Sequence, residues 1–139
     1  MADIALTAAQ IAPVDCCQNE IYSFVAGGTI TAGQSVSLTA AGLAVPADAD
    51  GTPPLTQARG IALNGAGSGQ AVSVLKKGLC AGFTVSGMAY GAKIYPSATV
   101  GALADAAVSS QIPCGQVVAL PDSSATKIAY FEFNWTAGY

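Results

Sequence analysis

Short apolar stretches separated by Gly, Pro and small polar residues run along most of the chain. The clearest is residues 127–135, where every second residue is apolar or aromatic: Ala129, Phe131, Phe133 and Trp135. Residues 35–39 and 70–75 alternate in the same way. A period of two predicts β-strands that bury one face.

Further apolar stretches extend this pattern over the rest of the chain. They predict strands at residues 21–26, 43–45, 58–63, 79–85, 92–95 and 116–120. Residues 46–57 and the Gly-rich 64–69 read as loops, and 76–78 as a polar turn or bulge. Residues 102–108 fit one or two helical turns or a loop equally well. Short strands with turns every 8–12 residues predict an all-β fold, a small barrel or sandwich.

The first twenty residues differ from the rest. They are rich in Ala and carry Ile4, Leu6 and Ile11 at no clean period. A short helix at residues 7–11 is conceivable, and an extended conformation is at least as compatible with the pattern. We therefore expect an extended N-terminal arm at residues 1–20 and one β domain at residues 21–139.

Composition excludes several classes of protein. Hydrophobic residues make up 52% of the chain and charged residues 9%, which is the reverse of a disordered chain. Five Lys and Arg against eight Asp and Glu give no basic field for nucleic acid. No apolar run approaches the roughly 20 residues of a membrane-spanning helix, and the acidic start does not resemble a secretory signal. We expect neither nucleic acid nor membrane as a partner.

The low charge also bears on assembly. A small monomer stays dispersed by covering itself with charged groups, at about 25–35% of its surface. This chain therefore either exposes many small neutral residues or has its surface covered by neighbouring subunits. We favour an oligomer or a component of a larger assembly, and a soluble monomer of low charge is the alternative.

No set of residues predicts catalysis, a metal or a cofactor. The chain has no His, which removes His-dependent triads and His metal sites. Asp48-Ala-Asp50-Gly51 resembles the start of a calcium loop, but Arg59 stands where the twelfth position needs Glu. The motif Ser73-x-x-Lys76 falls on a predicted strand, where positions three apart face opposite sides.

Other motifs have simpler explanations. The Gly-rich run at 64–69 lacks the Lys-Ser/Thr of a phosphate-binding loop. Lys76 and Lys77 are expected to meet a carboxylate or to keep a sheet edge soluble, rather than to carry a lipoyl or biotinyl group. The four cysteines lack the paired spacing of a zinc site and are expected to be reduced, buried thiols. We expect a protein that is not an enzyme.

Glycines and apolar residues between positions 27 and 121 follow a recognisable order. Its stretches read GQSVSL, GLAVPADAD, ARGIALNGAGSGQAVSVLKKG, GAKIYPS, GALADAA and CGQVVAL. The residues that carry the pattern are Gly33, Val36, Gly60, Ala62, Gly69, Val72, Val74, Gly78, Gly91, Ile94, Tyr95, Gly101, Gly115 and Val118. This part of the chain resembles the small capsid decoration, or cement, proteins of tailed bacteriophages.

The resemblance implies a function and a location. Proteins of that family are compact β barrels with an extended arm, often trimeric, that bind the outside of the phage head and hold the shell together. It implies the major capsid protein and further copies of this chain as partners, as a homotrimer or a dimer. It also implies synthesis in the host cytoplasm and a place on the outer surface of the virion. Ile4, Leu6 and Ile11 are the candidates for contact with the capsid or with a neighbouring subunit.

A receptor- or glycan-binding module of a phage head or tail is the alternative function. Exposed aromatic side chains would mark such a module. The candidates are Tyr130, Trp135 and Tyr139.

Overall fold

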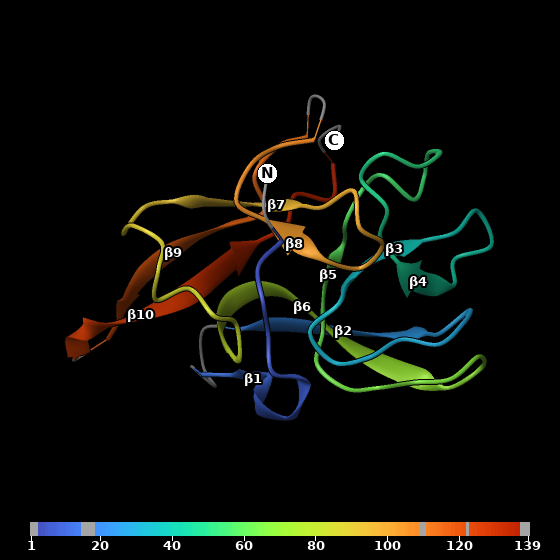
Figure 1. The fold of residues 1–139 in the computed structure, drawn as a ribbon. Helices are drawn as coiled ribbons and strands as arrows, with labels where there is room; N and C mark the ends of the chain where they lie inside the picture. Colours follow the sequence, from blue (N-terminus) through green and yellow to red (C-terminus); the bar gives the residue numbers. More distant parts are fainter. Residues whose placement is uncertain (1–2, 15–18, 109–110, 122, 137–139) are drawn as a thin grey trace.

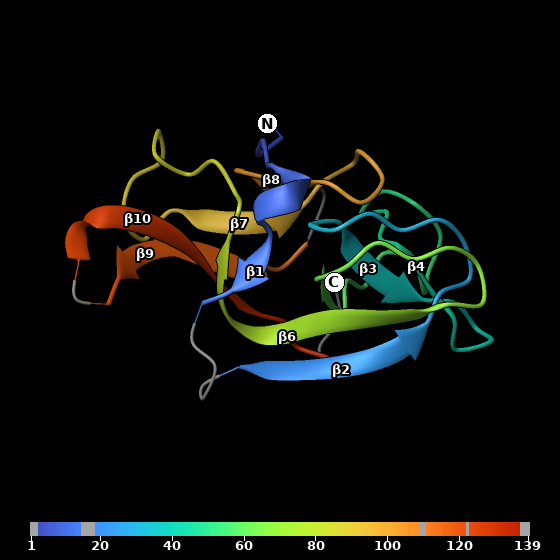
Figure 2. The same ribbon diagram turned by 90° about the horizontal axis from the view of Figure 1, so that it is seen from below.

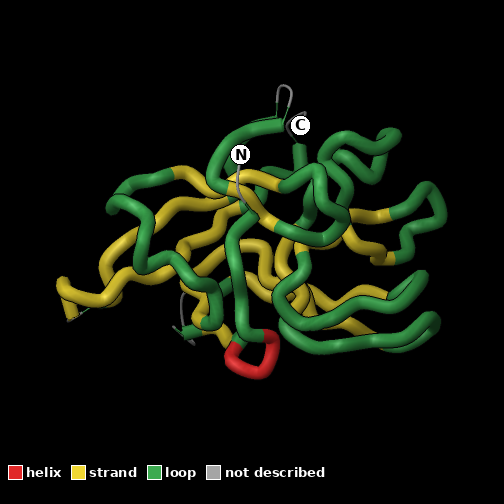
Figure 3. The backbone as a smooth tube through the Cα atoms, viewed as in Figure 1, coloured by secondary structure: helices red, strands yellow, loops and turns green. Residues whose placement is uncertain are grey.

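A computed structural model describes residues 3–14, 19–108, 111–121 and 123–136 of the chain. Within these ranges the protein is all-β, as expected, and its one helical element is the 3-10 turn η1 (Ala8–Gln10), shown red in Figure 3. The strands are β1 (Ala12–Pro13), β2 (Glu20–Val25), β3 (Ser35–Leu38), β4 (Ala44–Pro46), β5 (Gly60–Ala62), β6 (Ala71–Ala81), β7 (Lys93–Pro96), β8 (Leu103–Ala104), β9 (Gly115–Leu120) and β10 (Ser123–Glu132). No helix in the described ranges is long and apolar enough to cross a bilayer.

The strands form one curled sheet whose order is β4-β3-β5-β6-β10-β9-β7-β8. The named strands pair antiparallel throughout, and β1 and β2 pair with β6 outside this path. Figures 1 and 2 show the β9–β10 hairpin at one end of the molecule and β3 and β4 at the other. This architecture confirms the predicted class of a small β barrel or sandwich.

Strand β6 is the central element of the fold. It runs unbroken through Lys76, Lys77 and Gly78, so the polar stretch there is a bulge and not a turn. At Gly78 φ is +142°, and a Cβ would lie 2.1 Å from the Asn19 side-chain oxygen, so only Gly fits. The bulge changes which side chains face a given side of the strand. Leu75 before it and Cys80 after it pack into the same hydrophobic cluster, although an unbroken alternation would put them on opposite faces.

Two hydrophobic clusters fill the two sides of the curled sheet. The larger surrounds Phe131, which packs edge-on against Phe83 at 5.3 Å and stacks with Phe133 at 5.9 Å between ring centroids. The smaller contains Val36, Val72 and Val74. Because Leu75 and Cys80 belong to the first cluster and Val72 and Val74 to the second, β6 links them.

Most predicted strands are present with shifted ends. The alternation predicted for residues 127–135 is confirmed, since Ala129, Phe131 and Phe133 are buried while Glu132 is exposed. The strand itself starts earlier, at Ser123, and ends at Glu132. Region 102–108 forms the short β8 followed by a turn, not a helix.

The N-terminal segment is extended and lies along its own domain. In Figure 1 it runs, in dark blue, from β8 down to β1. Isolated bridges join Asp3 to Ala104 and Leu6 to Phe83, and β1 then pairs with the end of β6. The single 3-10 turn interrupts this otherwise extended path.

Candidate functional site

The three predicted contact residues of the arm lie against the hydrophobic core. Ile4 and Ile11 are buried, with 9% and 8% of their surfaces exposed, and Leu6 is partly buried against the same cluster. Room for Ile11 comes from Gly82, where φ is +103° and a Cβ would lie 2.6 Å from the Ile11 Cδ1. Their role in contacting a capsid or a second subunit stays a prediction, and in this chain they hold the segment to its own domain.

Backbone and side-chain hydrogen bonds also hold the segment. The Ile4 N–H donates to the Leu103 carbonyl at 2.8 Å, and the Thr84 N–H donates to the Ala5 carbonyl at 2.8 Å. The Ser97 hydroxyl donates to the Asp3 carboxylate. This bond and a second one from Thr99 lower the pKa of Asp3. The segment is thus fixed along its length.

The residues of the Ser-x-x-Lys motif have structural partners in β6. The Ser73 N–H donates to the Asn64 side-chain oxygen at 2.7 Å. The Lys76 ammonium lies 3.7 Å from the Glu20 carboxylate. The neighbouring Lys77 lies 4.0 Å from Glu132. Both lysines therefore meet carboxylates, which was the first of the two alternatives, and they lie in the central strand of the sheet.

The Gly-rich loop joins β5 to β6 and is closed by its own groups. The Gly67 N–H donates to the Gln70 side chain at 2.6 Å, and Ala66 forms a bridge with Ile30. The Ala66 N–H donates to the Ile30 carbonyl at 2.9 Å and the Gly69 N–H to the Ala26 carbonyl at 2.7 Å, so these N–H groups have partners within the domain. A hairpin loop explains the glycines.

The acidic loop brings Asp48 close to Asp50. A hydrogen bond between the two carboxyl groups raises the pKa of Asp48, and burial and the negative charge of Asp50 raise it further. Among the described residues no three Cys, Asp or Glu side chains come together in a way that could hold a metal ion. The loop is an acidic turn in this structure.

Cys80 and Cys114 are buried thiols without a disulfide partner. Burial raises the pKa of Cys80 to about 12 and raises that of Cys114 as well. Neither thiol is a nucleophile at neutral pH, because the thiolate is the reactive form. Cys16 and Cys17 lie outside the described residues.

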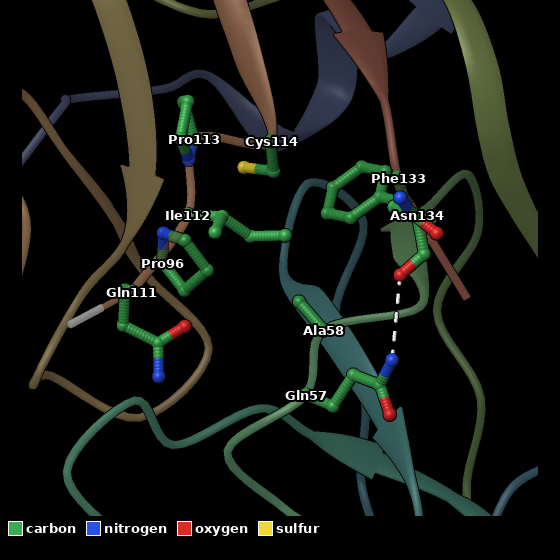
Figure 4. Close-up of a pocket in the computed structure, with 9 residues that line it drawn as sticks. All are labelled: Gln57, Ala58, Pro96, Gln111, Ile112, Pro113, Cys114, Phe133 and Asn134. Atoms are coloured by element: carbon green, nitrogen blue, oxygen red, sulfur yellow. Dashed lines mark hydrogen bonds between the residues drawn. The ribbon is translucent and has the colours of Figure 1, made fainter. Parts of the chain in front are cut away.

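The pocket in Figure 4 is too small for an organic ligand. It lies between the loop before β9 and the loop before β5, with Cys114 and Phe133 in its wall. Its volume is about 20 Å³, which is room for about one water molecule. Gln57 closes one side by donating to the Asn134 carbonyl at 3.3 Å, and the buried Gln111 donates to the Ala49 carbonyl at 3.1 Å.

A larger, open groove of about 490 Å³ lies beside Trp135. The Trp135 ring contacts Tyr22 at 4.8 Å, and the Lys76 ammonium stands 5.4 Å over it. The indole N–H donates to the Arg59 carbonyl at 2.7 Å. Trp135 is half-buried and its ring contacts other residues of the domain. A sugar-binding site that stacks a sugar on Trp needs a free ring face.

Tyr130 and Tyr139 are the other two aromatic candidates. Tyr130 is half-buried, and its hydroxyl donates to Glu132 at 2.8 Å. Burial and this bond raise its pKa to about 12. Tyr139 lies outside the described residues.

Several large apolar side chains are exposed on the surface. They are Val14, Ile21, Tyr22, Val25, Leu43, Tyr90, Val100 and Ile112. Three of them belong to one strand, β2. Nothing in the sequence singles out β2 as exposed, because an apolar run of this length also fits a strand buried between neighbours.

Comparison with models of known protein families gave no match, and neither did a search of curated protein sequences.

Proposed function

We propose that this chain is a capsid cement protein that binds the outside of a phage head and bridges neighbouring subunits of the major capsid protein. It acts as an oligomer, a trimer or a dimer, and stabilises the shell against internal DNA pressure. The proposal begins from the resemblance over residues 27–121. The observation that carries it is the structural role of the glycines in that pattern.

Each of the seven glycines in the pattern has a geometric reason to be Gly. Five adopt positive φ: Gly33, Gly69, Gly78, Gly91 and Gly101. At the other two, Gly60 and Gly115, a Cβ would lie 2.5 Å from a backbone carbonyl oxygen of the adjacent strand. The backbone of this β fold therefore requires Gly at the positions that carry the pattern, which supports reading the pattern as a signature of the fold.

The surface suits a protein whose work is binding other protein. Charged residues make up 9% of the chain, and large apolar side chains such as Val100 and Tyr90 stand about half exposed. Specific protein interfaces bury about 1,200–2,000 Å² in total and need no catalytic group. Repetition over an icosahedral shell multiplies modest contacts through avidity.

The direct test uses phage heads from which decoration proteins have been removed. Purified protein is added, heads are sedimented, and the ratio of bound protein to major capsid protein is measured over a concentration series. Saturation at a fixed ratio, with heads that survive more heat, is the expected result. Absence of saturable binding would contradict the proposal.

Substitutions at exposed apolar positions locate the contact. Val14, Tyr90, Val100 and Ile112 are changed singly to Asp, and at least one change should weaken head binding about tenfold or more, since burying an unpaired charge is costly. Ser68→Asp, on the exposed Gly-rich loop, is the matched control and should bind normally. Thermal melting of each variant shows that the domain remains folded.

A further inference from the structure

Strand β2 is an open, apolar edge. Figure 2 shows it as the outermost strand beside β6, and β6 is its one strand partner in the part of the chain that the structure describes. Ile21, Tyr22 and Val25 are 45%, 41% and 49% exposed. Soluble proteins normally protect such an edge with Lys, Pro or a bulge along its length. Here the one charged residue is Glu20, at the first position, next to the register shift.

The backbone groups that point away from β6 can be identified. The Ala26 N–H donates to the Gln70 carbonyl at 2.8 Å, and the same register continues through Phe24 and Tyr22. In an antiparallel pair, alternate residues direct both their N–H and C=O toward one neighbour. The even-numbered residues therefore bond to β6. The N–H and C=O groups of Ile21, Ser23 and Val25 point outward.

The side chains of β2 divide in the same alternating way. The rings of Tyr22 and Phe24 lie on the Trp135 side, with centroids 4.8 and 6.0 Å from its ring. Ile21, Ser23 and Val25 lie on the opposite face of the strand. Each face of the edge thus has its own apolar surface.

We propose that β2 pairs antiparallel with β2 of a second copy of this chain, around a twofold axis that passes between the two Ser23 residues. Such an axis is perpendicular to the sheet, so each face of the sheet continues from one copy into the other. The odd-numbered residues of one copy therefore lie opposite the odd-numbered residues of the other. The register centred on Ser23 places Ile21 opposite Val25 of the second copy and Tyr22 opposite Phe24.

This register uses all the outward-facing groups of the strand. Ile21, Ser23 and Val25 of each copy donate their N–H groups to the other copy and accept in return. Aliphatic side chains meet on one face and aromatic side chains on the other, which are favourable cross-strand pairs. The two Glu20 carboxylates fall at opposite ends, about 20 Å apart at the strand rise of about 3.3 Å per residue.

A second copy fits the edge because the edge is self-complementary. A register shifted by two residues in either direction is also symmetric. It places Ser23 opposite Ile21 or opposite Val25, and so loses the contact between Ile21 and Val25 of the two copies. Of the trimer and the dimer that the proposed function allows, this pairing gives the dimer. The pairing itself does not rest on the capsid role, because it follows from β2 alone.

Charge substitutions at Ser23 test the register. Ser23 is exposed, so a charge there leaves the domain folded, which circular dichroism and thermal melting verify. Ser23→Glu alone and Ser23→Lys alone each place like charges directly opposite and should give monomers. A 1:1 mixture should restore the dimer, because Glu then meets Lys across the axis. Ser68→Glu and Ser68→Lys are the matched controls and should remain dimers.

Light scattering after size-exclusion chromatography and sedimentation velocity give the mass of each sample. The wild type should have twice the mass of one chain and should dissociate on dilution. A wild-type monomer at millimolar concentration, a trimer, or a mixture of the two charge variants that stays monomeric would overturn the inference. A monomeric wild type whose binding to heads is abolished by Ser23→Glu would show that the β2 edge binds a strand of the capsid. That result would also overturn the pairing of β2 with a second copy. Head binding by wild type tests the capsid role separately.

Discussion

Ile11→Ala is expected to destabilise the whole domain, although Ile11 lies near the start of the chain. The side chain is 8% exposed and packs closely against Gly33 and Gly82. The backbone around it is held by the Thr7 N–H on the Gly82 carbonyl at 2.9 Å and the Val14 N–H on the Leu79 carbonyl at 3.0 Å. The site therefore cannot collapse around the smaller side chain.

Removal of a buried Ile side chain costs about 2–5 kcal/mol when a cavity remains. We expect about 3 kcal/mol here, because both flanks are fixed. With a urea m-value of about 2 kcal/mol/M, this lowers the unfolding midpoint by about 1.5 M. For a chain of this length the same loss lowers Tm by about 10 °C.

Urea unfolding followed by Trp135 fluorescence measures this change at one fixed protein concentration. Ile112→Ala is the matched control, since Ile112 is 41% exposed and its truncation should change the free energy of unfolding by no more than about 0.5 kcal/mol. Equal midpoints for the two variants would refute the reasoning. They would mean that the N-terminal segment detaches at little cost and that the domain is stable without it.

Two further predictions concern ionisable groups. Native protein treated with iodoacetamide at pH 8 should carry no label on Cys80 or Cys114 until it is unfolded, since both thiols are buried with raised pKa values; peptide mass spectrometry locates the label, and rapid native labelling of either thiol would contradict the structure. The raised pKa of Asp48 means that the folded state binds the Asp48 proton more tightly than the unfolded state does. The contribution of Asp48 to stability is therefore present below the ordinary pKa of Asp and is lost as pH rises through the raised pKa. The Tm of wild type relative to Asp48→Asn should therefore fall with rising pH between about pH 3 and pH 7, and a constant difference would show that Asp48 titrates normally.

The alternation of apolar and polar residues was sufficient to predict a strand where one face of that strand is buried. It predicted β10 correctly, because Phe131 and Phe133 contact the core and Glu132 meets solvent. It divided β6 into two pieces at Lys76–Gly78, since a polar pair followed by Gly is typical of a turn. The strand continues there because two distant strands pair with it. Glu20 and Glu132 both lie opposite Lys77, 57 and 55 positions away in the chain, and a local pattern does not reveal such partners.

The N-terminal segment and the open edge depended on contacts that the sequence does not reveal. Ile4 and Ile11 follow no period because the segment touches β8, residue 83 and β6 in turn through short bridges. Whether an apolar strand such as β2 lies at an edge or in the centre depends on which strands flank it.

The place of β10 in the sheet has a consequence for synthesis. It follows every other strand in the chain, yet it lies between β6 and β9 in the sheet. The group β4-β3-β5-β6 and the group β9-β7-β8 therefore remain unjoined on the ribosome until residues 123–132 have emerged. At about 5–20 residues per second, the edge of β6 waits about 3–10 seconds for β10, and the edge of β9 waits about 1–2 seconds. Overproduction should therefore place its strongest demand on chaperones at this stage, before the last strand closes the sheet.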